Sequence, residues 1–460
     1  MHKKFFLYNK RYYIYDRRFH MSFALQVKNT LLQDIADMEQ IRWLFSKHPQ
    51  TDFSRERKFN FSTTLHFLLG METGTVRQEL LKYFSFSPAT PSNSAFFQQR
   101  NKLLPQTLPF LSERFNTHYP FSLYKNQYHL LACDGSSFTF TRNPLDTESY
   151  FPPDNKTTRG YNQVHLVALF DLLSKRYCDM VVQPIRKKNE FQALTTLIDR
   201  YHSSNTTPIF IADRGFHSFN VFAHAIEHNA YFLIRAKEIN MQRLLGEELP
   251  TEDCFDLSVE RILTRSQSKK KRLIPEREKD YRLICKEVTF DYIIPGTPTE
   301  YPISLRILRF KISEDTYESI VTNLPVEEFS LEEIKFLYGL RWGIETSFRE
   351  LKHTIGAIRF HSKQREYIEM ELWARIILYN FCSIITNHVI LKQKQRKHLY
   401  QVNYTIAYNA CQYLFRLHQG ETPPNIESLI EQNILPIRLD RKYARQHRFR
   451  VPVSFTYRFI

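Results

Sequence analysis

Three acidic residues that lie far apart in the chain could act together in catalysis: Asp134, Asp213 and Glu345. Asp134 follows the apolar run YHLLAC and Asp213 follows PIFIA, and both runs are typical of buried strands. Open α/β sheets place their chemistry at the carboxyl ends of strands, so we expect both carboxylates at such an edge. Each aspartate alone is weak evidence, because Asp-Gly and Asp-Arg-Gly after a strand are also ordinary turns.

Glu345 belongs to a predicted helix over 331–355 that carries a narrow polar stripe. At about 100° per residue, the stripe contains Tyr338, Arg341, Glu345 and Lys352, with Arg349 at its border. The apolar residues lie on the adjoining flank: Leu337, Leu340, Ile344, Phe348, Leu351 and Ile355. A solvated face with ion pairs at helical spacing would give the same stripe. Two glycines inside the helix, Gly339 and Gly343, each cost about 0.5–1 kcal/mol, which favours a close approach by another backbone or a ligand. Trp342, beside the stripe, could stack on such a partner.

The stripe has the spacing Y-x2-R-x3-E-x6-K, which resembles the signature of the insertion-sequence-four family of bacterial DDE transposases. The wider segment YGLRWGIETSFRELK resembles that family's third catalytic region, and CDGSS and IADRGF resemble the first and second. The three regions have the order and spacing of that family, and the resemblance covers roughly residues 127–390. The resemblance implies a transposase that cuts DNA at the ends of an insertion sequence and joins those ends to a target, in cut-and-paste transposition.

The resemblance also implies roles for individual residues. Asp134, Asp213 and Glu345 would be the catalytic residues and would hold two Mg²⁺ ions, or Mn²⁺, about 3.5–4 Å apart. Residues of the helical stripe would bind DNA beside the metal ions: Tyr338, Arg341, Lys352 and Arg349. Water would attack first and the liberated 3′ hydroxyl second, without a covalent protein intermediate.

The predicted elements indicate an α/β fold, and the resemblance implies an RNase H-like mixed sheet with flanking helices, a β-rich insertion and a helical N-terminal domain. The expected boundaries are 1–20 for a basic extension (Met21 could be the true start), 21–120 for the helical domain that binds the DNA ends, 121–238 and 326–395 for the two parts of the catalytic core, 239–325 for the insertion, and 396–460 for a C-terminal helical and Arg-rich tail.

Within the predicted N-terminal domain, TVRQELLKYF, the turn SFSPATPSN and SAFFQQRNKLL are compatible with a helix-turn-helix. Its candidate DNA contacts are Ser94, Gln98, Arg100 and Lys102. Helix pairs with polar outer faces are common, so the pattern by itself is weak.

The chain has 460 residues, with 64 Lys and Arg against 48 Asp and Glu, and this net charge of +16 would suit a polyanion if concentrated on one surface. Six scattered cysteines without a CxxC pair suggest neither a zinc framework nor disulfides, so we expect a cytoplasmic, nucleoid-associated protein. The most apolar segment, 372–391, contains Arg375 and His388 and is too polar for a membrane span. The expected partners are double-stranded DNA, both terminal repeats and target, and a second copy of the chain.

Two alternatives remain open: a domesticated nuclease of the same fold, and a DNA-binding repressor with a vestigial catalytic fold. Some relatives form a DNA hairpin and stack a flipped base on a tryptophan of the insertion, but 239–325 contains none. The aromatic residues that could substitute are Phe255, Phe290, Tyr292 and Tyr301, so the hairpin route stays open. Three histidines show no ligand spacing and are expected to be packed or on the surface: His165, His217 and His353.

Overall fold

The computed structural model describes residues 22–154, 160–203, 205–245, 250, 252–266, 280–294, 296, 299–314, 316–389, 399–418 and 420–437. The predicted basic extension 1–20, the basic run KKKR at 269–272 and most of the Arg-rich tail lie outside these residues.

A mixed sheet forms the centre of the molecule. Its first five long strands are β1 (Tyr128–Phe140), β3 (Tyr161–Asp171), β4 (Arg176–Pro184), β5 (Thr207–Ala212) and β6 (Tyr231–Ala236). They lie side by side in the order β4-β3-β1-β5-β6, with the short β2 (Tyr150–Phe151) also on β3. The β3 strand is antiparallel to β1 and β4, whereas β1, β5 and β6 are parallel. This order and these directions are those of the RNase H-like sheet that the family resemblance implies.

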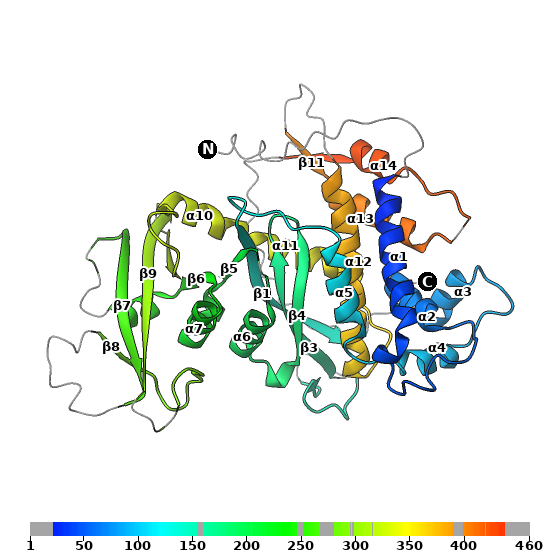
Figure 1. Ribbon diagram of the computed structural model, residues 1–460, viewed down its shortest axis with the longest axis horizontal. Coiled ribbons are helices and arrows are strands. Elements are labelled where there is room, and N and C mark those ends of the chain that lie inside the picture. Colours follow the sequence, from blue (N-terminus) through cyan, green and yellow to red (C-terminus); the bar gives the residue numbers. More distant parts are fainter. Residues whose placement is uncertain are drawn as a thin grey trace.

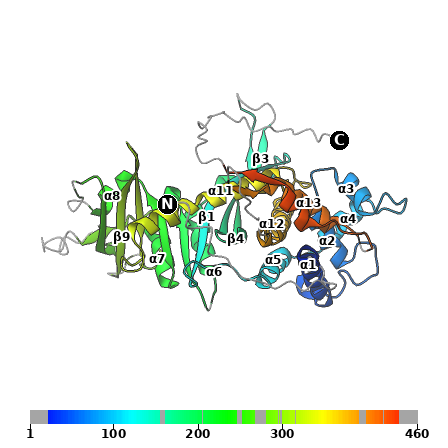
Figure 2. The same ribbon diagram turned by 90° about the horizontal axis from the view of Figure 1, so that it is seen from above.

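Successive residues of β1 alternate between the two faces of the sheet, as a strand requires. Leu131 and Cys133 pack in the core under α6 (Glu190–Arg200) and α7 (Phe219–Glu227). Leu130 and Ala132 pack in the core on the opposite face, together with apolar residues of the helices that follow the insertion. Figures 1 and 2 show α6 and α7 on one side of the sheet and α11 on the other.

The predicted β-rich insertion extends the same sheet. It contains α8 (Glu238–Leu245), β7 (Phe255–Thr264), β8 (Tyr281–Leu283), β9 (Glu300–Ser313) and β10 (Thr316–Thr322). The β10 strand pairs antiparallel with β6, and the sheet continues in the order β10-β9-β7-β8. In the segment YRLICKEVTFDYII, whose alternating pattern is typical of a strand, only the first three residues form β8.

After the insertion, the predicted helix over 331–355 is divided into α10 (Leu331–Leu340) and α11 (Trp342–His353). The division is at Arg341, whose backbone N–H donates to the carbonyl of Tyr338 at 3.1 Å. Both halves keep the expected apolar flank, with Leu337, Ile344 and Leu351 fully buried.

Within the described residues, the N-terminal region is helical, as predicted: α1 (Phe23–Gln40), α2 (Phe61–Gly70), α3 (Val76–Tyr83), α4 (Asn93–Arg100) and α5 (Thr107–Thr117). The helices after the catalytic region are α12 (Arg365–His388), α13 (Tyr404–Arg416) and α14 (Ile426–Gln432), with β11 (Tyr400–Val402) and β12 (Ile434–Pro436) paired beside them. The two groups share one hydrophobic core, and buried Arg375 of α12 donates to the carbonyls of Met71 and Glu72. None of the described helices is long and apolar enough to cross a lipid bilayer.

Candidate active site

Strand register brings Asp134 and Asp213 to the same edge and the same face of the sheet. The parallel pairing of β1 with β5 ends at Cys133 opposite Ala212, so each aspartate is the next residue on its strand path. The alternation of side chains puts both on the face covered by α11, because Ala132 and Ile211 belong to the core on that face. Contrary to expectation, β1 does not end at Asp134 but continues antiparallel to β3 as far as Phe140.

The two carboxylates have different local partners. Asp134 is 22% exposed and accepts the backbone N–H of Gly135 at 2.8 Å. Burial raises the pKa of Asp134 to about 6, Asp213 and Glu345 add to the rise, and the Gly135 hydrogen bond and Arg341 oppose it. Asp213 accepts the N–H of Gly215 at 2.7 Å and so begins a short 3-10 turn over Arg214–Phe216. The rise that Asp213 and Glu345 cause in the pKa of Asp134 indicates that negative charge accumulates at this edge.

Helix α11 adds Glu345 to the same edge, with Arg341 between the acids. The Arg341 guanidinium donates to Glu345 at 2.7 Å and lies 3.9 Å from a carboxylate oxygen of Asp134. Gly343 permits this close packing of the helix on the sheet, since a Cβ there would lie 3.2 Å from the Leu172 side chain. A Cβ at Gly339 would meet no described atom within 4 Å, so only one of the two predicted close approaches is present.

The other residues of the predicted stripe differ in exposure. The ammonium group of Lys352 donates to the Ser136 hydroxyl at 2.7 Å and the Ser137 carbonyl at 3.0 Å, and it lies 4.7 Å from the centre of the Phe138 ring. Tyr338 is 7% exposed, and its ring centre lies 5.7 Å from the Arg341 guanidinium carbon. Arg349 is exposed. Trp342, which follows Arg341 in the sequence, is 58% exposed.

Sequence reasoning missed a polar pair on the other side of β1. His165 of β3 is buried as expected, but it lies 2.8 Å from Glu190 of α6 and 3.2 Å from the Ser137 hydroxyl. Both groups leave no room for a side chain at Gly135, because a Cβ there would lie 2.5 Å from the His165 Nε2 and 2.9 Å from a Glu190 oxygen. The glycine next to Asp134 is therefore required for space. The glycine beside Asp134 in CDGSS could have indicated a tightly packed position, but the residues that limit its space, His165 and Glu190, are brought together only by the fold.

The donor chemistry at this edge fits a hard divalent cation. All three acids supply carboxylate oxygens, the ligands that Mg²⁺ and Mn²⁺ prefer. In this structure Arg341 lies among them, and the three do not form a group whose ligand atoms are all within 4.8 Å; among the described residues only Asp199, His224 and His228 do so.

The predicted helix-turn-helix contacts are only partly at the surface. Ser94 and Gln98 of α4 are exposed, and Lys102 is half-buried. Arg100 was expected to contact DNA, but it is 3% exposed and paired with the equally buried Glu371 of α12 at 3.4 Å. Its partner is 271 residues away in sequence, so the pattern of α4 alone made a structural arginine look like a surface one.

Comparison with known proteins agrees with the motifs. A family profile described as "Transposase DDE domain" matches residues 125–381, more than half of the chain. A curated relative, the transposase InsG for insertion sequence element IS4 of Escherichia coli strain K12, is 23% identical over 335 residues. That match spans 69% of this chain and 66% of the relative, slightly less than two thirds of its length.

A solved structure, a synaptic complex of the piggyBac transposase with hairpin DNA, covers 91% of this chain and 87% of its own at 12% identity, with a TM-score of 0.39. That score is too low to add to the argument. The DDE transposase family implies dependence on a divalent metal ion. On the profile match and the motifs it contains, this chain belongs to the DDE transposase family and is of its insertion-sequence-four type.

Proposed function

We propose that the chain is the transposase of an insertion sequence, which cleaves DNA at the element's ends and transfers the liberated 3′ ends to target DNA with Mg²⁺ as the divalent cation. The observation that carries the proposal is the meeting of Asp134, Asp213 and Glu345 at one edge of the sheet, from three distant parts of the sequence. In this proposal the three acids are the catalytic residues and the metal ligands. The bound cations would activate the attacking oxygen and stabilise the leaving one.

The residues around the acids receive complementary roles. Arg341 can hold a DNA phosphate bidentately, and exposed Arg349 adds charge on the approach to the edge. Lys352 is proposed to hold a phosphate next to β1. Its ammonium group would then divide its hydrogen bonds between that phosphate and its present acceptors, Ser136 and Ser137. Because Tyr338 is buried, we propose that it assists DNA binding by supporting the Arg341 side chain.

Double-stranded DNA, as terminal inverted repeats and as target, is the proposed substrate, and a homodimer is proposed to bring two ends together. Arg341 lies within reach of two of the acids, so a phosphate that draws Arg341 toward itself would release carboxylate oxygens for cations. Binding of DNA and loading of cations would then assist each other.

The test uses the full chain and DNA fragments that carry one end of the element. Asp134→Ala, Asp213→Ala and Glu345→Ala should each abolish Mg²⁺-dependent nicking, while gel retardation of the same fragment stays largely intact. Glu332→Ala, which removes an exposed acid of α10, is the matched control and should nick like the wild type.

Each outcome separates the candidate functions. Nicking followed by strand transfer supports the transposase, whereas nicking without transfer identifies the nuclease. Retardation without nicking by the wild-type chain identifies the repressor. Substantial nicking by any of the three alanine variants contradicts the assignment of the acids.

A further inference from the structure

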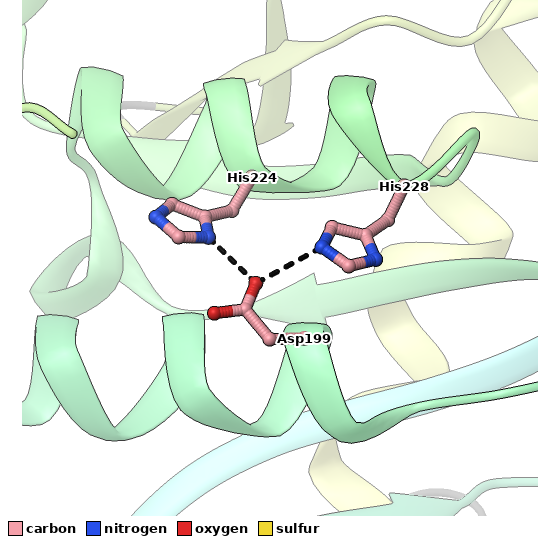
Figure 3. A group of neighbouring side chains, drawn as sticks. All are labelled: Asp199, His224 and His228. Atoms are coloured by element: carbon pink, nitrogen blue, oxygen red, sulfur yellow. Dashed lines mark hydrogen bonds and ion pairs between the residues drawn. The ribbon is translucent and has the colours of Figure 1, made fainter. Parts of the chain in front are cut away.

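A cluster of side chains that could hold a metal ion lies between α6 and α7. Figure 3 shows Asp199 of α6 between His224 of α7 and His228, the residue that caps the end of α7. One carboxylate oxygen of Asp199 lies 2.7 Å from His224 Nδ1 and 3.1 Å from His228 Nε2. One ligand atom from each of the three side chains lies within 4.8 Å of the other two.

His224 is oriented by a further carboxylate. Its Nε2 lies 2.9 Å from Asp291, a residue of the insertion. Asp291 is held in turn by Asn220, which donates to its carboxylate at 2.8 Å and accepts its backbone N–H at 2.9 Å. A histidine that gives one N–H to a carboxylate presents the lone pair of its other nitrogen, which is the usual arrangement around metal-bound histidines. Here that other nitrogen is the one that faces Asp199.

We propose that Asp199, His224 and His228 bind a Zn²⁺ ion, with water as the fourth ligand. Two imidazole nitrogens and one carboxylate oxygen form a common donor set for tetrahedral zinc. Zinc–ligand bonds of about 2.0–2.1 Å place tetrahedral ligand atoms about 3.3 Å apart. The two separations from the Asp199 oxygen, 2.7 and 3.1 Å, would have to widen by about 0.6 and 0.2 Å to reach this spacing.

Local electrostatics also favour a cation at this position. Asp199 lies in the last turn of α6, and His224 and His228 lie at the end of α7. The carbonyl ends of both helices carry partial negative charge. With neutral histidines, the charges of Asp199 and Asp291 balance a divalent ion.

The proposed ion would have a structural role apart from DNA cleavage. Asp199 is nine residues beyond Glu190 on α6, about 13 Å along the helix from the end that packs beneath Gly135. The ion would join α6 to α7 directly. Through His224 and Asp291 it would also fasten the insertion to the RNase H-like part of the chain.

Zinc binding is tested with tag-free, metal-stripped full chain, by calorimetry with ZnCl₂ and by the visible spectrum after addition of CoCl₂. Tetrahedral Co²⁺ with nitrogen ligands absorbs strongly, whereas Co²⁺ held only by the carboxylates of the candidate active site absorbs weakly. We expect one tight Zn²⁺ per chain, a tetrahedral Co²⁺ spectrum and a higher melting temperature in Zn²⁺ than in EDTA.

Asp199→Asn and His228→Gln should each weaken Zn²⁺ binding at least 100-fold and remove both the Co²⁺ spectrum and the Zn²⁺-dependent rise in melting temperature. Asp291→Asn should weaken binding about 10–100-fold, as losses of orienting carboxylates do. His202→Gln, at an exposed histidine just beyond α6, is the control and should bind like the wild type.

Far-ultraviolet circular dichroism identifies any variant that fails to fold, and the remaining ligand variant then decides. The proposal is overturned if the wild-type chain takes up no stoichiometric Zn²⁺, or if the folded ligand variants bind as the wild type does. Loss of stability in these variants that is equal with and without Zn²⁺ also overturns it, because the cluster is then only a hydrogen-bonded ion-pair network.

Discussion

Replacing Arg100 by methionine distinguishes a structural arginine from a DNA contact. The side chains of Arg100 and Glu371 are 4% and 3% exposed, so the change leaves a carboxylate without its partner in the core. Loss of one partner of a buried pair costs about 3–5 kcal/mol. Burial alone would raise the pKa of Glu371, but bonds from His361 and the charge of Arg100 hold that pKa below its ordinary value.

His361 still donates its backbone N–H to Glu371 at 2.9 Å in the variant, so we expect the lower end of the range, about 3 kcal/mol. For a cooperative unit of about 150–250 residues, 1 kcal/mol corresponds to about 2–4 °C. The melting temperature should therefore fall by about 6–12 °C, as measured by scanning calorimetry.

Gln98→Ala, an exposed change on the same helix, is the control and should alter stability by no more than about 0.5 kcal/mol. DNA-end affinity is measured for both variants at a temperature where both are folded. Arg100→Met should bind DNA nearly as the wild type does. If it melts like the wild type but loses DNA affinity, the burial argument is refuted and Arg100 belongs to the recognition surface.

Three further predictions concern acidity, space and charge. Burial lowers the pKa of His66 to about 4, so the unfolded chain binds more protons than the folded chain between pH 6.5 and 4. The free energy of unfolding therefore falls as the pH drops through that window. In His66→Gln this fall, measured by denaturant unfolding, should be smaller by about 3 kcal/mol. Gly135→Ala should cost about 1–3 kcal/mol of stability and most of the nicking activity, because the methyl group meets His165, and calorimetry and nicking on one preparation check this. Lys352→Ala should weaken DNA binding and reduce the slope of log K against log salt by about 0.9, and Arg341→Lys should also weaken binding. Unchanged slopes and affinities would show that these two cations do not contact DNA.

The parts of the site that follow from local pattern could be predicted. An apolar run before each aspartate predicts a buried strand, and the two-residue period of strands then puts Asp134 and Asp213 on one face once the strands are neighbours. The helical period likewise predicts the buried flank that carries Ile344 and Leu351. The break at Arg341 was not predicted, because it alters only the backbone hydrogen bonds around one residue and does not change that period.

Contacts between distant segments could not be predicted. The bonds of Lys352 to Ser136 and Ser137 join residues more than 200 positions apart, and no local pattern marks them. Arg100 was assigned to DNA for the same reason. His224 of α7 and His228 at its C-cap are four residues apart, a spacing visible in the sequence, but Asp199 joins them only because α6 lies beside α7.

Asp134, Asp213 and Glu345 are proposed to bind the divalent cation together, at the place where the pairing of β1 with β5 ends. Anomalous diffraction from crystals of the full chain with a cognate DNA end, soaked in Mn²⁺, tests this directly. We expect an Mn²⁺ peak in contact with oxygens of all three carboxylates, with the Arg341 guanidinium turned from Glu345 toward a phosphate. A bound DNA end with no Mn²⁺ peak at these acids, or with Arg341 still paired to Glu345 and the ion elsewhere, would contradict it.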